Sequence, residues 1–164
     1  MKPAKERSDF SHAEEVLALA ISAEMDAHQF YLRAADQTKD GKVRATFLAL
    51  AGDEEGHRLQ LKAQYPHLNG KGGGPLPPRD QCSASISEKD LDELEAIALS
   101  IKAEKEAINF YQASSEKAED LGLKKLLLSL SEFEDGHRRL LESEYQARLG
   151  RPWNDFELAL WVRE

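Results

Sequence analysis

The sequence has one cysteine and no long hydrophobic run. Cys82 therefore cannot form an internal disulfide, and no C-x-x-C pair offers a cysteine site for zinc or iron, which fits a reducing compartment. No stretch approaches the roughly 18 apolar residues of a membrane span, and the first residues are too charged for an export signal. We therefore expect a cytoplasmic protein without a membrane partner.

Aromatic residues make up only 7% of the chain, and Ala, Leu, Glu, Lys and Gln dominate it. This composition favours helices over sheets, so the expected fold class is all-α. The length of 164 residues, 41% of them hydrophobic, suits one well-packed domain. Thirty acidic against 22 basic residues give a formal net charge of −8, which repels phosphate backbones and makes nucleic acid an unexpected partner.

The sequence contains an internal repeat. A shift of 80 positions aligns the two halves without a gap, and about a third of positions 17–65 are identical to their partners. The matched segments include Ala23-Glu24 with Ala103-Glu104, Phe30-Tyr31 with Phe110-Tyr111, Glu54 with Glu134, Gly56-His57-Arg58 with Gly136-His137-Arg138, and Tyr65 with Tyr145. Each half is thus predicted to be one copy of the same unit.

Apolar residues recur at helical spacing within each copy and predict four helices, at roughly 11–39, 42–65, 88–119 and 123–148. Ser11 to Glu14 has the pattern of a capping box, and breaks are expected at Lys39 to Gly41 and at Asp120 to Gly122. Residues 66–86 are rich in glycine and proline and are expected to form a connector. After Gly150, Asn154 and Glu157 could cap a short helix in the tail 150–164, which carries Leu160 and Trp161.

The connector is long enough to run the full height of a bundle of such helices. The predicted architecture is therefore a four-helix bundle of two hairpins joined by a long crossover, with a short C-terminal helix. A crossover of this length would also permit two chains to exchange hairpins, so we expect a homodimer in which hairpin exchange is an open alternative.

Polar residues interrupt the apolar stripe of every predicted helix. One glutamate does so on the first and third helices, and a Glu-x-x-His pair does so on the second and fourth, with both members on one face. Counting outward from the hairpin breaks places all of them at one level of the bundle. The six residues are Glu24, Glu54, His57, Glu104, Glu134 and His137.

Four carboxylates buried together need neutralisation, because an isolated buried charge costs several kcal/mol. Two divalent cations would supply the four positive charges. Carboxylate oxygen with imidazole nitrogen suits iron or manganese and is compatible with zinc. The sequence therefore predicts a site for two metal ions, namely two Fe ions, with Mn or Zn as alternatives.

These motifs resemble those of the rubrerythrin and bacterioferritin-like branch of the ferritin-like superfamily, over roughly residues 12–148. The resemblance implies a non-haem di-iron centre that reacts with peroxide or oxygen, with Glu54 and Glu134 bridging and Glu24 and Glu104 terminal. Rubrerythrins also carry a rubredoxin domain, which is absent here, so electrons would come from a separate redox donor protein. They have a further glutamate one turn after the third-helix ligand, and Ala107 stands at that place, matched by Ala27.

Other functions remain open at this point: iron storage or transport, a non-catalytic bundle stabilised by zinc or manganese, and a di-iron hydroxylase. Tyr31 and Tyr111 lie two turns beyond Glu24 and Glu104, where a hydroxyl could orient a ligating carboxylate. His28 is interpreted as a packing or hydrogen-bonding residue. Glu55 and Asp135 adjoin the central glutamates but are expected to face solvent.

Overall fold

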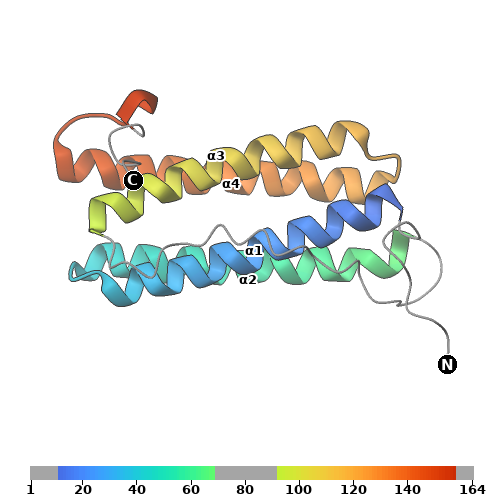
Figure 1. The fold of residues 1–164 in the computed structure, drawn as a ribbon, viewed down its shortest axis with the longest axis horizontal. Coiled ribbons are helices and arrows are strands. Elements are labelled where there is room, and N and C mark those ends of the chain that lie inside the picture. The colour runs from blue at the N-terminus through green and yellow to red at the C-terminus, as the bar shows by residue number, and fades with distance from the viewer. Residues whose placement is uncertain (1–10, 69–91, 158–164) are drawn as a thin grey trace.

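The protein forms four long α-helices in a computed structural model that describes residues 11–68 and 92–157. They are α1 (His12–Gln37), α2 (Gly41–Leu68), α3 (Glu93–Lys117) and α4 (Leu121–Leu149), and a short 3-10 helix, η2 (Asp155–Glu157), follows them. Figure 1 shows the four helices side by side along their whole length. The all-α four-helix bundle expected from the sequence is therefore confirmed.

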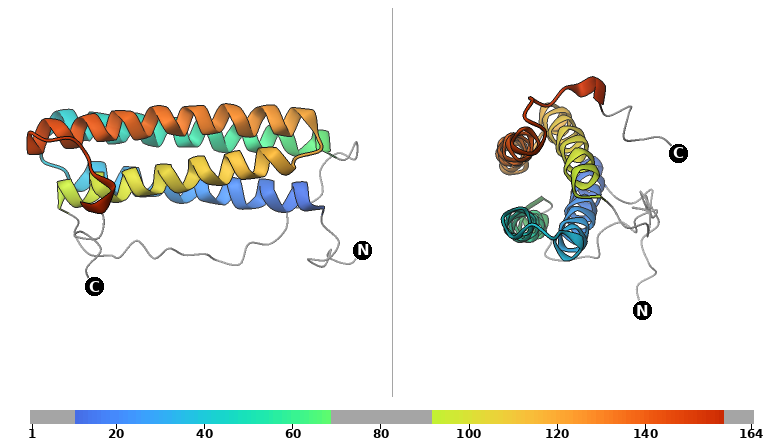
Figure 2. Two further views of the ribbon diagram at one scale, coloured as in Figure 1. Left: turned by 90° about the horizontal axis from the view of Figure 1, so that it is seen from above. Right: turned by 90° about the vertical axis from the view of Figure 1, so that its left-hand side faces the viewer.

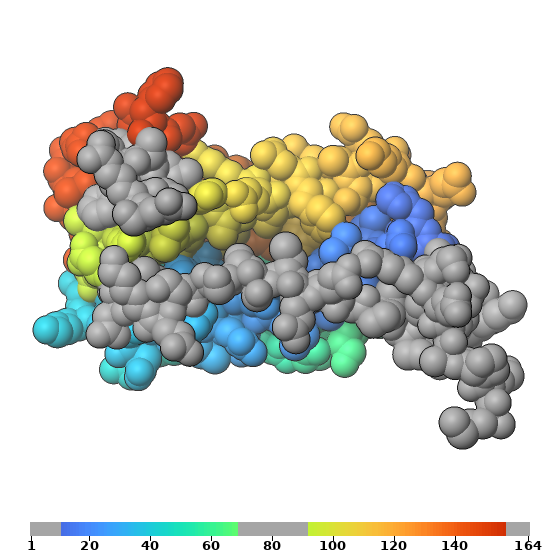
Figure 3. All heavy atoms as spheres, in the orientation of Figure 1, coloured from blue at the N-terminus to red at the C-terminus, as the bar shows by residue number. Residues whose placement is uncertain are grey.

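The helices are arranged as two antiparallel hairpins. The first hairpin pairs α1 with α2 and the second pairs α3 with α4, in agreement with the repeat. Between the hairpins, α1 lies beside α3 and α2 beside α4 (Figure 2). In the space-filling view, α3 and α1 together form one face of the bundle (Figure 3).

Two apolar clusters fill the two ends of the bundle. One includes Phe30, Phe47, Ile97 and Leu141, and the other includes Leu17, Leu61, Leu127 and Leu130. Both clusters draw residues from all four helices. The stretch of each helix between these clusters is the level at which the six polar residues lie.

Aspartates fix the starts of the second helix of each hairpin. Asp40 Oδ1 accepts hydrogen bonds from the amides of Lys42 and Val43 at 2.8 and 3.0 Å, and Asp120 Oδ1 accepts one from Leu123 at 2.7 Å. At the start of α1 the predicted capping box is present. The predicted breaks thus occur, and the residues that follow each aspartate belong to the next helix because its first turn is capped.

The observed helix bounds correct the prediction in three places. α2 continues to Leu68, past the expected end at 65, although Pro66 has no amide N–H for the carbonyl four residues earlier. α3 does not include Asp92, which has an extended backbone at the N-cap position. α4 begins at Leu121 rather than 123. The remaining connector and the expected start of the third helix at 88 lie outside the described residues.

The segment after α4 folds back over the end of the second hairpin. Gly150 ends α4 in the left-handed region, at φ 68°, which glycine adopts without steric cost. The Trp153 ring packs edge-on against Tyr145, with ring centres 4.9 Å apart. Asn154 Oδ1 accepts from the Phe156 amide at 3.1 Å, close to the predicted cap, whereas Leu160 and Trp161 lie outside the described residues. Within the described ranges, no helix combines the length and hydrophobicity that a membrane span requires.

Candidate metal centre

The structure brings all six sequence-predicted site residues together in the middle of the bundle. Every helix contributes, and each of the six side chains belongs to a residue that is at least nine-tenths buried. α1 carries Glu24, α2 carries Glu54 and His57, α3 carries Glu104, and α4 carries Glu134 and His137.

The six residues form two overlapping groups that share the two central glutamates. Ligand atoms of Glu24, Glu54, His57 and Glu134 lie within 4.8 Å of one another. The same is true of Glu54, Glu104, Glu134 and His137. Glu54 and Glu134 thus stand between a Glu and His pair on either side, which is the arrangement of two adjacent cation sites with two shared carboxylates.

Each histidine turns Nδ1 toward the carboxylates. His57 Nδ1 lies 3.1 Å from an oxygen of Glu54, 3.1 Å from one of Glu134 and 3.5 Å from one of Glu24. The two imidazole rings are stacked, with centres 5.6 Å apart.

The second histidine repeats this arrangement. His137 Nδ1 lies 3.0 Å from Glu134, 3.2 Å from Glu54 and 3.7 Å from Glu104. The internal repeat of the sequence is therefore reproduced as an approximate two-fold symmetry of the site.

The donor set fits two divalent cations. Glu54 Oε1 and Glu134 Oε1 are buried and make no hydrogen bond of regular geometry; each faces a histidine Nδ1, that of His137 at 3.2 Å and that of His57 at 3.1 Å, where a cation would replace the proton between them. Four carboxylates and two neutral imidazoles would balance the charge of two such ions. Oxygen with nitrogen donors suits iron and manganese and tolerates zinc.

In the metal-free protein, the pKa values of the terminal carboxyls are raised and those of the central carboxyls are lowered. Burial raises the pKa of Glu24 to about 8 and that of Glu104 well above its usual range. Burial acts in the same sense on Glu54, but hydrogen bonds with the two histidines outweigh it and lower the pKa to about 2. The pKa of Glu134 is lowered for the same reason.

The histidines hold protons in the metal-free site. Burial would lower their pKa values, but contacts with Glu134 and other carboxylates dominate and raise the pKa of His57 to about 12 and that of His137 to about 11. Near neutral pH, protons on the two imidazoles and on Glu24 and Glu104 therefore cancel the charge of the four carboxyls. Bound cations would replace these protons.

Two buried tyrosines hold the terminal glutamates across the bundle. The Tyr31 hydroxyl donates to Glu104 Oε1, and the Tyr111 hydroxyl donates to Glu24 Oε1. Each tyrosine thus contacts the glutamate of the other repeat, whereas the glutamate on its own helix lies two turns, about 10 Å, away. Burial, followed by the charge of the contacted glutamate, raises the pKa of both hydroxyls well above the usual value, so they remain donors.

Two residues at the outer edges of the histidines were missed by sequence reasoning. Asp53 Oδ2 lies 3.2 Å from His137 Nε2, and the Phe133 ring packs against His57 with centres 5.4 Å apart. Each residue lies four positions before the histidine of its own helix and contacts the histidine of the other. The shift of 80 positions pairs Asp53 with Phe133, and that mismatch within an otherwise matched motif is the signal that could have found them.

The neighbours of the central glutamates point away from the cluster. Glu55 pairs with Arg58 at 2.6 Å and Asp135 with Arg138 at 2.8 Å, on partly exposed faces. His28 Nδ1 lies 2.7 Å from the Ala51 carbonyl oxygen, which is the hydrogen bond that the sequence interpretation allowed. None of these residues reaches the shared ligand atoms.

Ala27 and Ala107 are half-buried and pack against the apolar clusters at opposite ends of the bundle. Neither offers a ligand atom, so the described site has one terminal glutamate on each side.

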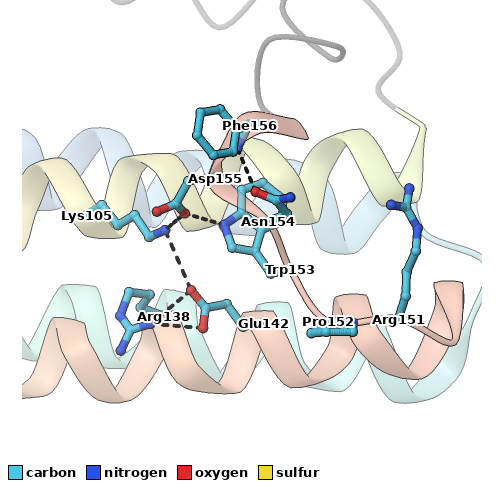
Figure 4. Close-up of a pocket in the computed structure, with 9 residues that line it drawn as sticks. All are labelled: Lys105, Arg138, Glu142, Arg151, Pro152, Trp153, Asn154, Asp155 and Phe156. Atoms are coloured by element: carbon cyan, nitrogen blue, oxygen red, sulfur yellow. Dashed lines mark hydrogen bonds and ion pairs between the residues drawn. The ribbon is translucent and has the colours of Figure 1, made fainter.

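A surface hollow of about 670 Å³ lies elsewhere, between α3, α4 and the segment after α4 (Figure 4). Lys105 faces Asp155 and Glu142 there, and Arg138 also faces Glu142. These cationic side chains have carboxylate partners within the protein.

Comparisons with known proteins agree with this geometry. The sequence model of the rubrerythrin family matches residues 15–91 and 95–152 of the chain. A hypothetical protein from Pyrococcus furiosus is 28% identical, with 100% of both chains covered and a TM-score of 0.68. No protein of curated function matches the chain.

Two further solved structures share the fold. A candidate ferritin-like diiron-carboxylate protein from Thermotoga maritima is 22% identical, with 85% of this chain and 96% of that chain covered and a TM-score of 0.66. An uncharacterised conserved protein from Magnetospirillum magnetotacticum is 18% identical, with 88% and 99% covered and a TM-score of 0.67.

Proposed function

The chain belongs to the rubrerythrin family, and on that premise we propose that it binds two iron ions and reduces peroxide or oxygen with electrons from a separate redox donor. The observation that carries the proposal is the pair of overlapping four-residue groups that share Glu54 and Glu134. A buried arrangement of this kind divides four carboxylates and two imidazoles evenly between two cations.

The roles of the residues follow from their places in the cluster. Glu54 and Glu134 would be ligands common to both ions, because each belongs to both groups. Glu24 and His57 would complete one ion's set of ligands. Glu104 and His137 would complete the other.

Bound iron would supply the redox chemistry, because a pair of ferrous ions can give up the two electrons that convert peroxide and two protons into two waters. The chain's own residues prepare the site for this step. Tyr31 and Tyr111 hold the terminal carboxylates by donating hydrogen bonds from positions that are themselves buried. The apolar clusters at both ends of the bundle limit access of water along its axis.

An external donor is part of the proposal. The sequence has one cysteine and no C-x-x-C pair, so the chain does not carry a cysteine-bound iron centre of its own. It also has no glycine-rich nucleotide motif that would bring in a flavin or nicotinamide. Each oxidised site must therefore be reduced again by another molecule.

The test is anaerobic loading with Fe(II) followed by rapid mixing with peroxide. We expect each site to consume about one peroxide while the visible absorption of the ferric product appears, and then to stop until a reductant is added. The Glu134→Ala variant should lose this absorption, and the Asp135→Ala variant should keep it.

Two results would contradict the proposal. Continued consumption of peroxide without a donor would show that the reducing electrons come from elsewhere. Protein that contains two irons per chain and shows no spectral change would exclude the redox role.

A further inference from the structure

The outer edges of the two histidines break the symmetry of the site. His137 faces a carboxylate at its Nε2 atom, where Asp53 Oδ2 lies 3.2 Å away. The ring of His57 packs instead against the ring of Phe133, with ring centres 5.4 Å apart. The other contacts of the site are paired by the repeat, so this difference stands out as a departure from an otherwise duplicated design.

The geometry of the His137 edge is that of a supported metal ligand. Nδ1 faces the central carboxylates and Nε2 faces Asp53, so the imidazole is held from both sides. A carboxylate at the second nitrogen fixes which nitrogen carries the proton, orients the ring and makes the first nitrogen a stronger donor to a metal. Asp53 is in place to do all three.

The His57 edge offers none of this support. Phenylalanine has no hydrogen-bond acceptor of comparable strength, and in the described part of the chain the carboxylate contacts of His57 all run through Nδ1. Phe133 covers the ring by packing instead, and its own side chain stays about half exposed. In the described residues His57 therefore lacks the carboxylate support that His137 has at its second nitrogen.

We propose that Asp53 is a positioning residue for His137 and that it makes the two metal subsites unequal, with the ion on the His137 side bound more tightly. The inference depends on the two-metal site proposed above and adds an order of filling to it. It also gives the two ions different surroundings, because only one of them has a histidine backed by a carboxylate.

The test uses metals that need no redox chemistry. Metal-free protein is titrated with Co(II) in competition with a chelator, and the two binding constants are fitted. With the wild type we expect two unequal constants, and Asp53→Asn should weaken the tighter one by about tenfold, the lower end of the range for such support because the Asp53 side chain is 61% exposed. Glu55→Gln removes the same charge from α2 two positions further along, outside the cluster, and should leave both constants unchanged.

Because the repeat pairs Asp53 with Phe133, the two residues can be exchanged. A merely structural role of Asp53 would not predict the changes in the two binding constants that we expect from this exchange. Phe133→Asp should place a carboxylate against His57 and bring the two constants together. Asp53→Phe should also bring them together, by weakening the tighter site. The double variant, with both changes, should restore two unequal constants with the order reversed.

Imidazole NMR signals identify the site that fills first. At one equivalent of Zn(II), the signals of His137 should shift first in the wild type and those of His57 first in the double variant. Circular dichroism of every variant confirms that the helices are retained.

Equal constants in the wild type, or an unchanged ratio in Asp53→Asn, would overturn the inference even if iron-loaded protein reduces peroxide. Conversely, if the swap reverses the order of filling but the iron form does not react with peroxide, the inference holds and the proposed reaction fails.

Discussion

Tyr31 and Tyr111 tie the two halves of the site together, because each donates its hydroxyl hydrogen to the terminal glutamate of the opposite repeat. A carboxylate that is already oriented loses less freedom when it binds a metal. The crossed hydrogen bonds also join the two hairpins at the level of the site. Their removal should therefore affect metal binding more than it affects the helices.

We expect Tyr31→Phe to weaken metal binding on the Glu104 side by about tenfold, because the ring remains and only the donor is lost. Tyr111→Phe should do the same on the Glu24 side. Tyr65→Phe is the matched control, since that hydroxyl contacts Glu14 outside the cluster. Chelator competition measures all three, and an equal loss in the control would mean that these hydroxyls act through general stability.

The central glutamates should differ sharply from their neighbours in sequence. Glu54→Ala should remove most of the bound metal, because this residue belongs to both four-residue groups. Glu55→Ala should not, because Glu55 pairs with Arg58 on the outside of the helix. Metal content per chain, measured by elemental analysis, decides between them, and equal losses would contradict the assignment of helix faces.

The six clustered residues could be predicted because helical periodicity places each on the inner face of its helix and the distance from each hairpin break sets its height. Sequence reasoning did not locate Asp53 and Phe133, or the crossed partners of the tyrosines. These contacts depend on how the two hairpins are placed against each other, and periodicity within one helix carries no information about that placement. The terminal glutamates and their helices were predictable, whereas contacts between the hairpins were not.

At the scale of the helices, the two hairpins are built by the same device. An aspartate after the first helix caps the amides of the second, at Asp40 for α2 and Asp120 for α4. The cap fixes where the second helix begins. It thereby fixes the height at which each Glu-x-x-His pair meets the glutamate of the preceding helix.

Asp120→Ala should lower the free energy of unfolding by about 1 kcal/mol, the usual cost of losing an N-cap. Asp92→Ala is the comparison, because Asp92 occupies the N-cap position of α3 without a side-chain cap hydrogen bond. Chemical denaturation of the metal-free protein measures both. A loss for Asp92→Ala as large as that for Asp120→Ala would show that capping is not the cause.

Helix ends were the part of the fold that sequence reasoning placed least well. Pro66 favours a helix end at residue 65, but proline removes only one hydrogen bond and the last turn of α2 tolerates that loss. The third helix was predicted from about residue 88, whereas Asp92 has an extended backbone at the N-cap position. The existence and pairing of the four helices, in contrast, followed from long periodic segments and a gapless repeat.

At the scale of the whole molecule, the two halves of one chain supply all six residues of the buried cluster. The expected homodimer, with or without exchanged hairpins, stays a prediction, and analytical ultracentrifugation of the metal-loaded protein checks the number of chains. If hairpins are exchanged between two chains, the same six residues would come from both.

Metal removal should destabilise the bundle, and the size of the effect should depend on pH. In the metal-free protein, protons take the place of the cations, because the pKa of Glu24 is raised to about 8 and those of His57 and His137 to about 12 and 11. The folded state therefore binds more protons than the unfolded chain around neutral pH. Since stability falls with pH wherever the folded state binds more protons, the metal-free protein should become less stable as pH rises.

The contribution of each group to folding stability has its own pH range. That of Glu24 is complete below the usual carboxyl pKa of 4.5 and is lost as pH rises through about 8. Those of the histidines are complete below 6.5 and are lost as pH rises toward 11 and 12. Glu54 has the opposite sign, because its pKa is lowered to about 2, and its contribution is constant above pH 5.

Metal binding should strengthen as pH rises, whereas the stability of the metal-free protein should fall. The ligands of the metal-loaded protein carry no protons when they bind the ions, so raising the pH removes competing protons and strengthens binding. Metal binding stabilises the folded state according to its affinity, and the melting temperature should therefore be higher with metal at every pH tested. The difference between loaded and metal-free protein should widen from pH 6.5 to pH 8.5.

Thermal melts at pH 6.5, 7.5 and 8.5 test this, with Zn(II) as a metal that does not change oxidation state and with anaerobic Fe(II) as the second arm. In weakly buffered solution, Zn(II) should also release protons, up to about four for each pair of ions, from Glu24, Glu104 and the two histidines. Glu134→Ala, which removes a central ligand, should narrow the difference in melting temperature at all three values of pH. A difference that stays constant or shrinks as pH rises, or binding without proton release, would mean that protons do not occupy the places of the metal ions.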